Sequence, residues 1–75
     1  MLQQRFGMVI PQGAINVRLL PSTSGAVLGS TGMTLAVIGQ NANASGFRVD
    51  YAGRAGWVSA SAVEVVFLPD NLPVE

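Results

Sequence analysis

The chain of 75 residues contains no cysteine, no histidine and no lysine. The lack of cysteine excludes disulfide bonds and thiolate metal sites, and the lack of histidine removes another common metal ligand. Enzymes most often activate a nucleophile with one of these three residue types. No other base lies near a serine in the sequence, so we expect a protein that is not an enzyme and that binds no metal or cofactor.

Charge is also scarce, because charged residues make up 11% of the chain and the formal net charge is +0. Nucleic-acid binding and recognition of anionic membrane surfaces both need clustered basic residues. The basic residues of this chain are instead dispersed along it: Arg5, Arg18, Arg48 and Arg54. We therefore expect no nucleic-acid partner and no anionic membrane surface as a partner.

Long apolar runs are missing too. The longest, at 35–38 and 65–68, have the length of strands and fall far short of the roughly 20 residues that span a bilayer. The opening stretch "MLQQRFGMVIPQG" lacks the continuous apolar segment of a signal peptide. We expect no membrane insertion and no signal peptide in this chain, which is then either not exported or a piece of a longer exported protein.

Alternation with a period of two residues recurs along the sequence. In "FRVDY", Phe47, Val49 and Tyr51 fall on one face and the charged residues on the other, the pattern of a half-buried strand. Similar runs are "INVR" at 15–18, "MTLAVIG" at 33–39, and "VEVVF" at 63–67, where Val63, Val65 and Phe67 share the expected inner face.

Glycine and proline separate these runs and mark turns. Five or six short strands joined by such turns favour a small all-β barrel or sandwich over residues 1–67. The last eight residues, "LPDNLPVE", hold two prolines and two acids. Residues 68–75 are therefore expected to form a linker or a loosely attached tail.

A hairpin is predicted over residues 47–58, with the chain reversing at "AGRA". Gly53 can supply a positive φ there, and Gly56 permits a bulge or a close backbone approach. Alternation points Phe47 and Tyr51 inward. Trp57 alternates with Val58, so only one of these two can point straight into the core.

With the hairpin placed, the chain resembles the bacterial SH3-like (SH3b) domain family. The matching segments are "INVRLLPSTSGAVLG", "GMTLAVIGQ" and "GFRVDYAGRAGWVSASAV". The similarity extends over about residues 14–65. It implies a small, partly open SH3-like barrel of about five to seven short strands. It also implies a non-enzymatic binding or positioning module of extracytoplasmic bacterial proteins, several of which recognise peptidoglycan peptides.

The residues offer one candidate ligand site. Trp57 and Tyr51 could form a shallow face for a sugar ring or an extended peptide, with polar contacts from Asn16 or Arg18. Alternatively, Tyr51 belongs to the core, and Arg18 is an ion-pair partner or a hydrogen-bond donor to a loop. The functional hypothesis is a module that recognises cell-envelope peptide or glycan for a larger bacterial protein outside the cytoplasm.

A second hypothesis starts from the 49% of hydrophobic residues, which exceed what one inward face requires. If exposed, Leu19, Leu20 and Ile38 would form a surface for neighbouring domains or a second copy of the chain. The protein would then be a structural or self-associating module without a small ligand. Exposure of Trp57 beside a groove favours the first hypothesis. A buried Trp57 with exposed Leu19 and Leu20 favours the second.

Overall fold

The computed structural model describes residues 7–20, 25–43, 45–69 and 72–74. Seven strands and one short 3-10 turn occur among these residues, and no α-helix does. The prediction of a small all-β fold is therefore confirmed. The elements are β1 (Gly7–Pro11), β2 (Ile15–Arg18), β3 (Val27–Thr31), β4 (Leu35–Gln40), β5 (Gly46–Tyr51), β6 (Arg54–Ser59), η1 (Ala60–Ala62) and β7 (Val63–Phe67).

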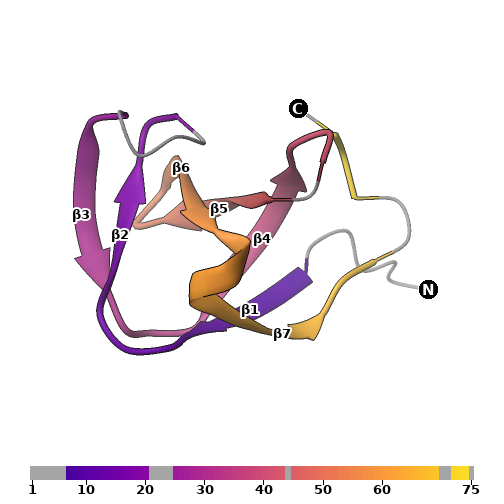
Figure 1. Ribbon diagram of the computed structural model, residues 1–75, viewed down its shortest axis with the longest axis horizontal. Coiled ribbons are helices and arrows are strands. Elements are labelled where there is room, and N and C mark those ends of the chain that lie inside the picture. Colours follow the sequence, from indigo (N-terminus) through magenta and orange to yellow (C-terminus); the bar gives the residue numbers. More distant parts are fainter. Residues whose placement is uncertain (1–6, 21–24, 44, 70–71, 75) are drawn as a thin grey trace.

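All seven strands belong to one antiparallel sheet, in the order β3-β2-β6-β5-β4-β1-β7. The sheet curls into a partly open barrel, with β3 and β7 as its two edges (Figure 1). Pairing is continuous over most of the sheet, but β2 and β6 share a single pair, Arg18 with Trp57. Among the described residues, no helix has the length and hydropathy needed to cross a bilayer.

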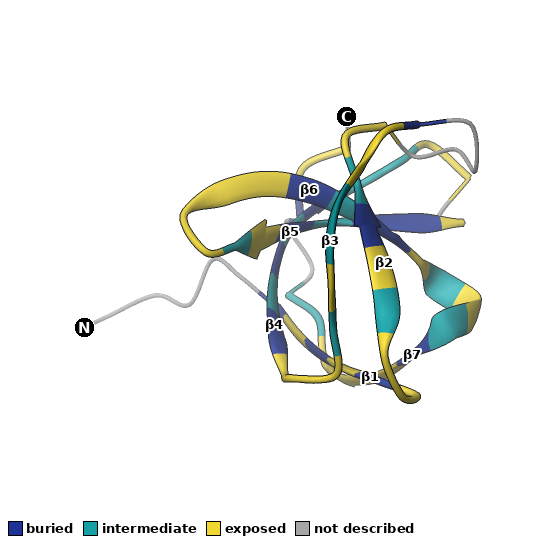
Figure 2. Ribbon diagram, turned by 90° about the vertical axis from the view of Figure 1, so that its left-hand side faces the viewer, coloured by how far each residue is buried: buried dark blue, intermediate teal, exposed yellow. Residues whose placement is uncertain are grey.

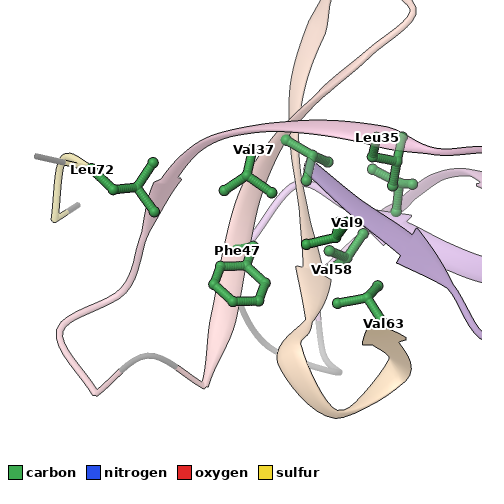
Figure 3. Packing of buried hydrophobic residues seen from close by; sticks show 9 residues of the cluster. Val9, Leu35, Val37, Phe47, Val58, Val63 and Leu72 are labelled. Carbon is green, nitrogen blue, oxygen red and sulfur yellow. The ribbon is translucent and has the colours of Figure 1, made fainter. Parts of the chain in front are cut away.

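The core lies inside the curled sheet, and its residues come from alternate positions of the strands (Figures 2 and 3). Alternation places every second side chain of a strand on the same face, and every strand except β3 contributes one or two residues to the buried core cluster. Four valines are completely buried and hold the centre. They are Val9, Val17, Val37 and Val49.

The predicted hairpin is confirmed, with a tight turn of two residues between the pair Tyr51 and Arg54. Gly53 has a φ of +83°, and Ala52 also lies in the left-handed region, at +52°. Turns of this kind match the twist of paired strands, but the left-handed region costs a residue with a Cβ about 1–2 kcal/mol. Asp50 offsets part of that cost, because its Oδ1 accepts a hydrogen bond of 3.0 Å from the Gly53 amide.

Strand β7 departs from the predicted alternation. Val63 is buried as expected, but Val65 and Phe67 are 46% and 41% exposed. The strand is an edge of the sheet, and a bulge shifts its register with β1 between Met8 and Val9. Both features turn apolar positions away from the core. Strands β1 and β3 were not among the runs that alternation singled out.

The C-terminal segment was expected to be a linker or a loosely attached tail, and its described part instead packs on the barrel. Leu72 is only 7% exposed and belongs to the core cluster, with its side chain pointing toward Val37 and Phe47 (Figure 3). The amide of Gln40 donates a 2.9 Å hydrogen bond to the Pro73 carbonyl, and Gln40 forms a parallel bridge with Val74. The apolar Leu72 thus closes one end of the core.

This packing predicts that Leu72→Ala lowers the free energy of unfolding by about 2–3 kcal/mol, within the usual cost of truncating a buried leucine. Val74→Ala is the matched control in the same segment, because Val74 is 63% exposed and its truncation should cost less than about 0.5 kcal/mol. Urea denaturation followed by circular dichroism measures both. Equal, small losses in the two variants would show that the segment is not part of the folded unit.

Candidate functional site

A groove separates β2 from β6 because the two neighbouring strands pair only once. β2 is paired with β3 from Ile15 to Arg18, with a register shift between Val17 and Arg18, and β6 is paired with β5 as far as Ser59. Beyond the pair of Arg18 with Trp57, however, β2 and β6 are no longer paired with each other. The space that opens has a volume of about 390 Å³, within the range of small-ligand sites. Its lining comprises Ile15, Asn16, Arg18, Leu20, Ser45, Gly46, Trp57, Val58, Ser59 and Ala62.

Gly56 lets the two strands approach each other at the closed end of the groove. A Cβ at this position would collide with Cγ1 of Val17 and would lie 3.5 Å from the carbonyl oxygen of Arg18. Val17 is completely buried and cannot move into free space. The prediction that Gly56 permits a close backbone approach is confirmed.

Trp57 forms one wall of the groove. Val58 takes the inward position, at 3% exposure, so Trp57 points outward and is half-buried. Its ring lies beside Gly46, where an added Cβ would be 3.6 Å from Cε3 of Trp57. Asn41 holds the loop around Gly46 with two hydrogen bonds. The backbone amide of Asn41 donates to the Gly46 carbonyl at 3.2 Å, and the side-chain Oδ1 of Asn41 accepts from the Gly46 backbone amide at 3.1 Å. The indole of Trp57 therefore packs beside the Gly46 loop and also lines the groove.

Arg18 lies at the groove and also supports the loop that follows β2. Its Nη1 donates a 2.9 Å hydrogen bond to the carbonyl of Gly25, and the amide of Leu19 donates to the Ala26 carbonyl at 2.8 Å. The prediction of Arg18 as a hydrogen-bond donor to a loop is confirmed. Among the described residues that line the groove, Arg18 alone carries a formal charge. Its contact with a ligand stays a prediction.

Tyr51 is the one predicted ligand-binding residue that does not line the groove. Its ring and hydroxyl lie against Gly29 on β3, so closely that a Cβ on Gly29 would collide with the hydroxyl. Tyr51 also packs on the core cluster, as alternation predicted. The structure thus brings Trp57, Asn16 and Arg18 together and separates Tyr51 from them.

Of the three residues predicted to form an interaction surface, two are adjacent and the third lies on another part of the sheet. Leu20 is 58% exposed and lines the groove, Leu19 is 46% exposed beside it, and Ile38 is half-buried on β4. The sequence did not indicate that Ile15, Ser45 and Ala62 line the groove. Ser45 lies in a loop, and Ala62 ends η1, so no periodic pattern marked either of them.

The groove offers an aromatic face, hydroxyl groups of Ser45 and Ser59, the amide of Asn16 and one guanidinium group. No acidic side chain is part of its described lining. This combination suits a polar ligand that is neutral or anionic and that has an apolar face for the indole. Across the part of the chain that the structure describes, no group of three or more His, Cys, Asp or Glu residues could hold a metal ion.

Comparison with known proteins does not add a relative. No protein-family model matches the chain, and neither the curated proteins nor the solved structures contain a match. The candidate site is therefore defined by the geometry of this chain.

Proposed function

We propose that the protein is a non-enzymatic binding module that holds a peptide or glycan of the cell envelope in the groove between β2 and β6. The position of Trp57 carries this proposal. It is the only tryptophan of the chain, and it forms the groove wall beside Asn16 and Arg18. An aromatic face flanked by a few convergent polar groups is the usual make-up of sites for sugar rings and peptides.

The strand edges beside the groove favour an extended peptide. Residues 15–17 of β2 and 58–59 of β6 are paired with β3 and β5 on one side and not with each other on the other. Backbone groups of a strand point alternately to its two sides. An extended peptide can use such groups for hydrogen bonds while its side chains contact Trp57 and Leu20.

The cell-envelope assignment also rests on the resemblance to bacterial SH3-like domains. The Asn-Val-Arg and Gly-Trp-Val pieces of that resemblance contain Asn16, Arg18 and Trp57, which meet at the groove. On this proposal the chain serves as a targeting domain of a larger bacterial protein located outside the cytoplasm, and neighbouring domains of that protein are further partners.

A structural or self-associating module without a small ligand is the second candidate. The exposure of Leu19 and Leu20, at 46% and 58%, favours it, because apolar groups of this size commonly mark contact surfaces. The two candidates differ in the role of Leu20. A ligand site uses it as one end of the groove, whereas an assembly surface buries it together with Leu19.

Sedimentation with purified insoluble peptidoglycan tests the proposal. We expect the protein to be retained, with soluble stem peptides or glycan strands as competitors that identify the recognised part. Asn16→Ala should weaken retention about fivefold, the equivalent of one hydrogen bond. Thr34 is an exposed polar residue outside the groove lining, so Thr34→Ala should leave retention on peptidoglycan unchanged. A folded wild-type protein that stays in the supernatant would contradict the proposal.

A further inference from the structure

Strand β7 leaves an unusual amount of apolar surface at the edge of the sheet. It is the last strand in the sheet order, so among the described residues its only strand partner is β1. Its last four residues are all exposed. Val65, Val66 and Phe67 are 46%, 54% and 41% exposed.

Strand β1 extends this surface. Met8 and Ile10 are 37% and 41% exposed, and they alternate with buried neighbours. Met8 is paired with Phe67 in the register of the two strands, so their side chains lie on the same face of the sheet. We call the set of exposed apolar side chains on these two strands the β7 patch. It comprises Met8, Ile10, Val65, Val66 and Phe67.

The β7 patch covers both faces of the edge strand. Phe67 is paired with the exposed Met8 on the outer face, whereas Val65 is paired with the buried Val9 on the inner face. Strands with apolar residues on both faces are typical of positions covered on both faces. In a single chain, however, Val65 and Phe67 remain partly exposed to solvent on the two faces of β7.

The edge also lacks most of the devices that prevent strand pairing between molecules. Natural edges carry lysine, proline or inward-pointing charges, and β7 has none of these, since its one charged residue, Glu64, is exposed. A bulge opposite β1 and the exposed charge of Glu64 are the two devices present on β7. We propose that β7 pairs antiparallel with β7 of a second copy of the chain, forming a two-fold dimer through the β7 patch.

The charges of the chain fit a second copy as the partner. In a two-fold antiparallel pairing centred on Val65, Glu64 lies opposite Val66 of the other copy, and in one centred on Val66 it lies opposite Leu68. In neither register do the two carboxylates face each other, so like-charge repulsion across the pair is avoided. The formal net charge of the chain is +0, so two copies do not repel each other over longer distances.

The available area fits a weak dimer. A specific interface buries at least about 1,000 Å² in total, so each copy would contribute roughly a tenth of its accessible surface of 4715 Å². On the pairing strand itself, Val65, Val66 and Phe67 are each about two-fifths to one-half exposed, and they contribute to that area together with the free edge of the strand. Interfaces at this lower limit are weak, and we expect a dissociation constant on the order of 100 µM.

This dimer is independent of the proposed ligand site. None of the residues of the β7 patch lines the groove between β2 and β6. The groove thus stays open in the dimer, and two copies would present two grooves. A failure of ligand binding would therefore not contradict the proposed dimer, and a failure of dimerisation would not contradict the proposed ligand site.

Sedimentation velocity from about 10 µM to about 1 mM tests the proposal on the wild-type chain and two variants. We expect a monomer–dimer equilibrium that Val66→Lys abolishes, because a charged side chain on the edge would have to be desolvated. The matched control is Val27→Lys on the opposite edge, β3, where Val27 is 49% exposed. It should leave the equilibrium unchanged.

Hydrogen exchange on the wild-type protein gives a test that needs no variant. Backbone amides of β7 should gain protection as the concentration rises through the dimerisation range, and those of β3 should not. A chain that stays monomeric at 1 mM would overturn the proposal. The proposal would also be overturned if Val27→Lys lost the dimer while Val66→Lys kept it. Open-ended filaments would overturn it too, because they would result from pairing of β3 with β7.

Discussion

Gly56→Ala should destabilise the protein by about 1–3 kcal/mol, the usual cost of forcing extra volume into a packed core. A methyl group at Gly56 would collide with Cγ1 of Val17, which is completely buried. This is a large part of the total, because a domain of this size has a net stability of only about 5 kcal/mol. Urea denaturation measures the loss as a shift of the midpoint at unchanged slope.

A double-mutant cycle shows whether this collision causes the loss. Val17→Ala removes the γ carbon that the new methyl group would meet, so the combined variant should lose at least about 1 kcal/mol less than the sum of the two single losses. Gly32→Ala is the control, because a Cβ there would lie at an ordinary 3.5 Å from its nearest neighbour, the Gly13 carbonyl oxygen. Additive losses in the cycle would contradict the close approach of β2 and β6.

Trp57→Ala should separate ligand binding from stability. The indole forms a wall of the groove and is half-buried, so its loss should weaken binding by roughly 30-fold, the effect of a central aromatic contact worth 2 kcal/mol. The cost in stability should be about 2 kcal/mol, below the 3–5 kcal/mol of a fully buried aromatic. Binding to peptidoglycan and urea denaturation of the same preparation give the two values.

Tyr51→Ala is the matched aromatic control. Tyr51 is also partly buried, but it packs against Gly29 and the core, away from the groove. Its truncation should therefore lower the stability by about 2–3 kcal/mol and leave the affinity of the folded protein unchanged. If Tyr51→Ala weakened binding as much as Trp57→Ala, the ligand would have to occupy another surface than the groove.

The sequence was most informative where alternation was regular. "FRVDY" placed Phe47 and Val49 in the core, and the glycines of "AGRAGW" predicted both the turn at Gly53 and the close approach at Gly56. Each of these features is local, since a strand period or a missing side chain is enough to indicate it. The all-β fold followed from several such features together.

Features that depend on distant partners could not be predicted in this way. The orientation of Trp57 follows from the choice of Val58 as the inward residue, which depends on the curvature of the whole sheet. Leu72 enters the core from a segment whose prolines and acids are typical of linkers. The exposure of Val65 and Phe67 follows from the position of β7 at the edge, which no pattern within "VEVVF" specifies.

The groove also depends on distant partners, because it results from an interrupted pairing between β2 and β6. Alternation along either strand shows which residues share a face but not where two strands cease to pair. The sequence therefore indicated Asn16, Arg18 and Trp57 as candidates, and only the sheet register shows that they meet while Tyr51 does not.

An NMR titration is the first test of our proposal that the groove between β2 and β6 binds a cell-envelope peptide or glycan. Soluble peptidoglycan fragments are added to the isotope-labelled protein, and the backbone amides and the indole NH of Trp57 are followed. We expect saturable shifts at Asn16, Trp57 and Ser59, with little change around Tyr51 and Gly29. Spectra that stay unchanged up to millimolar fragment, or shifts confined to residues outside the groove, would contradict it.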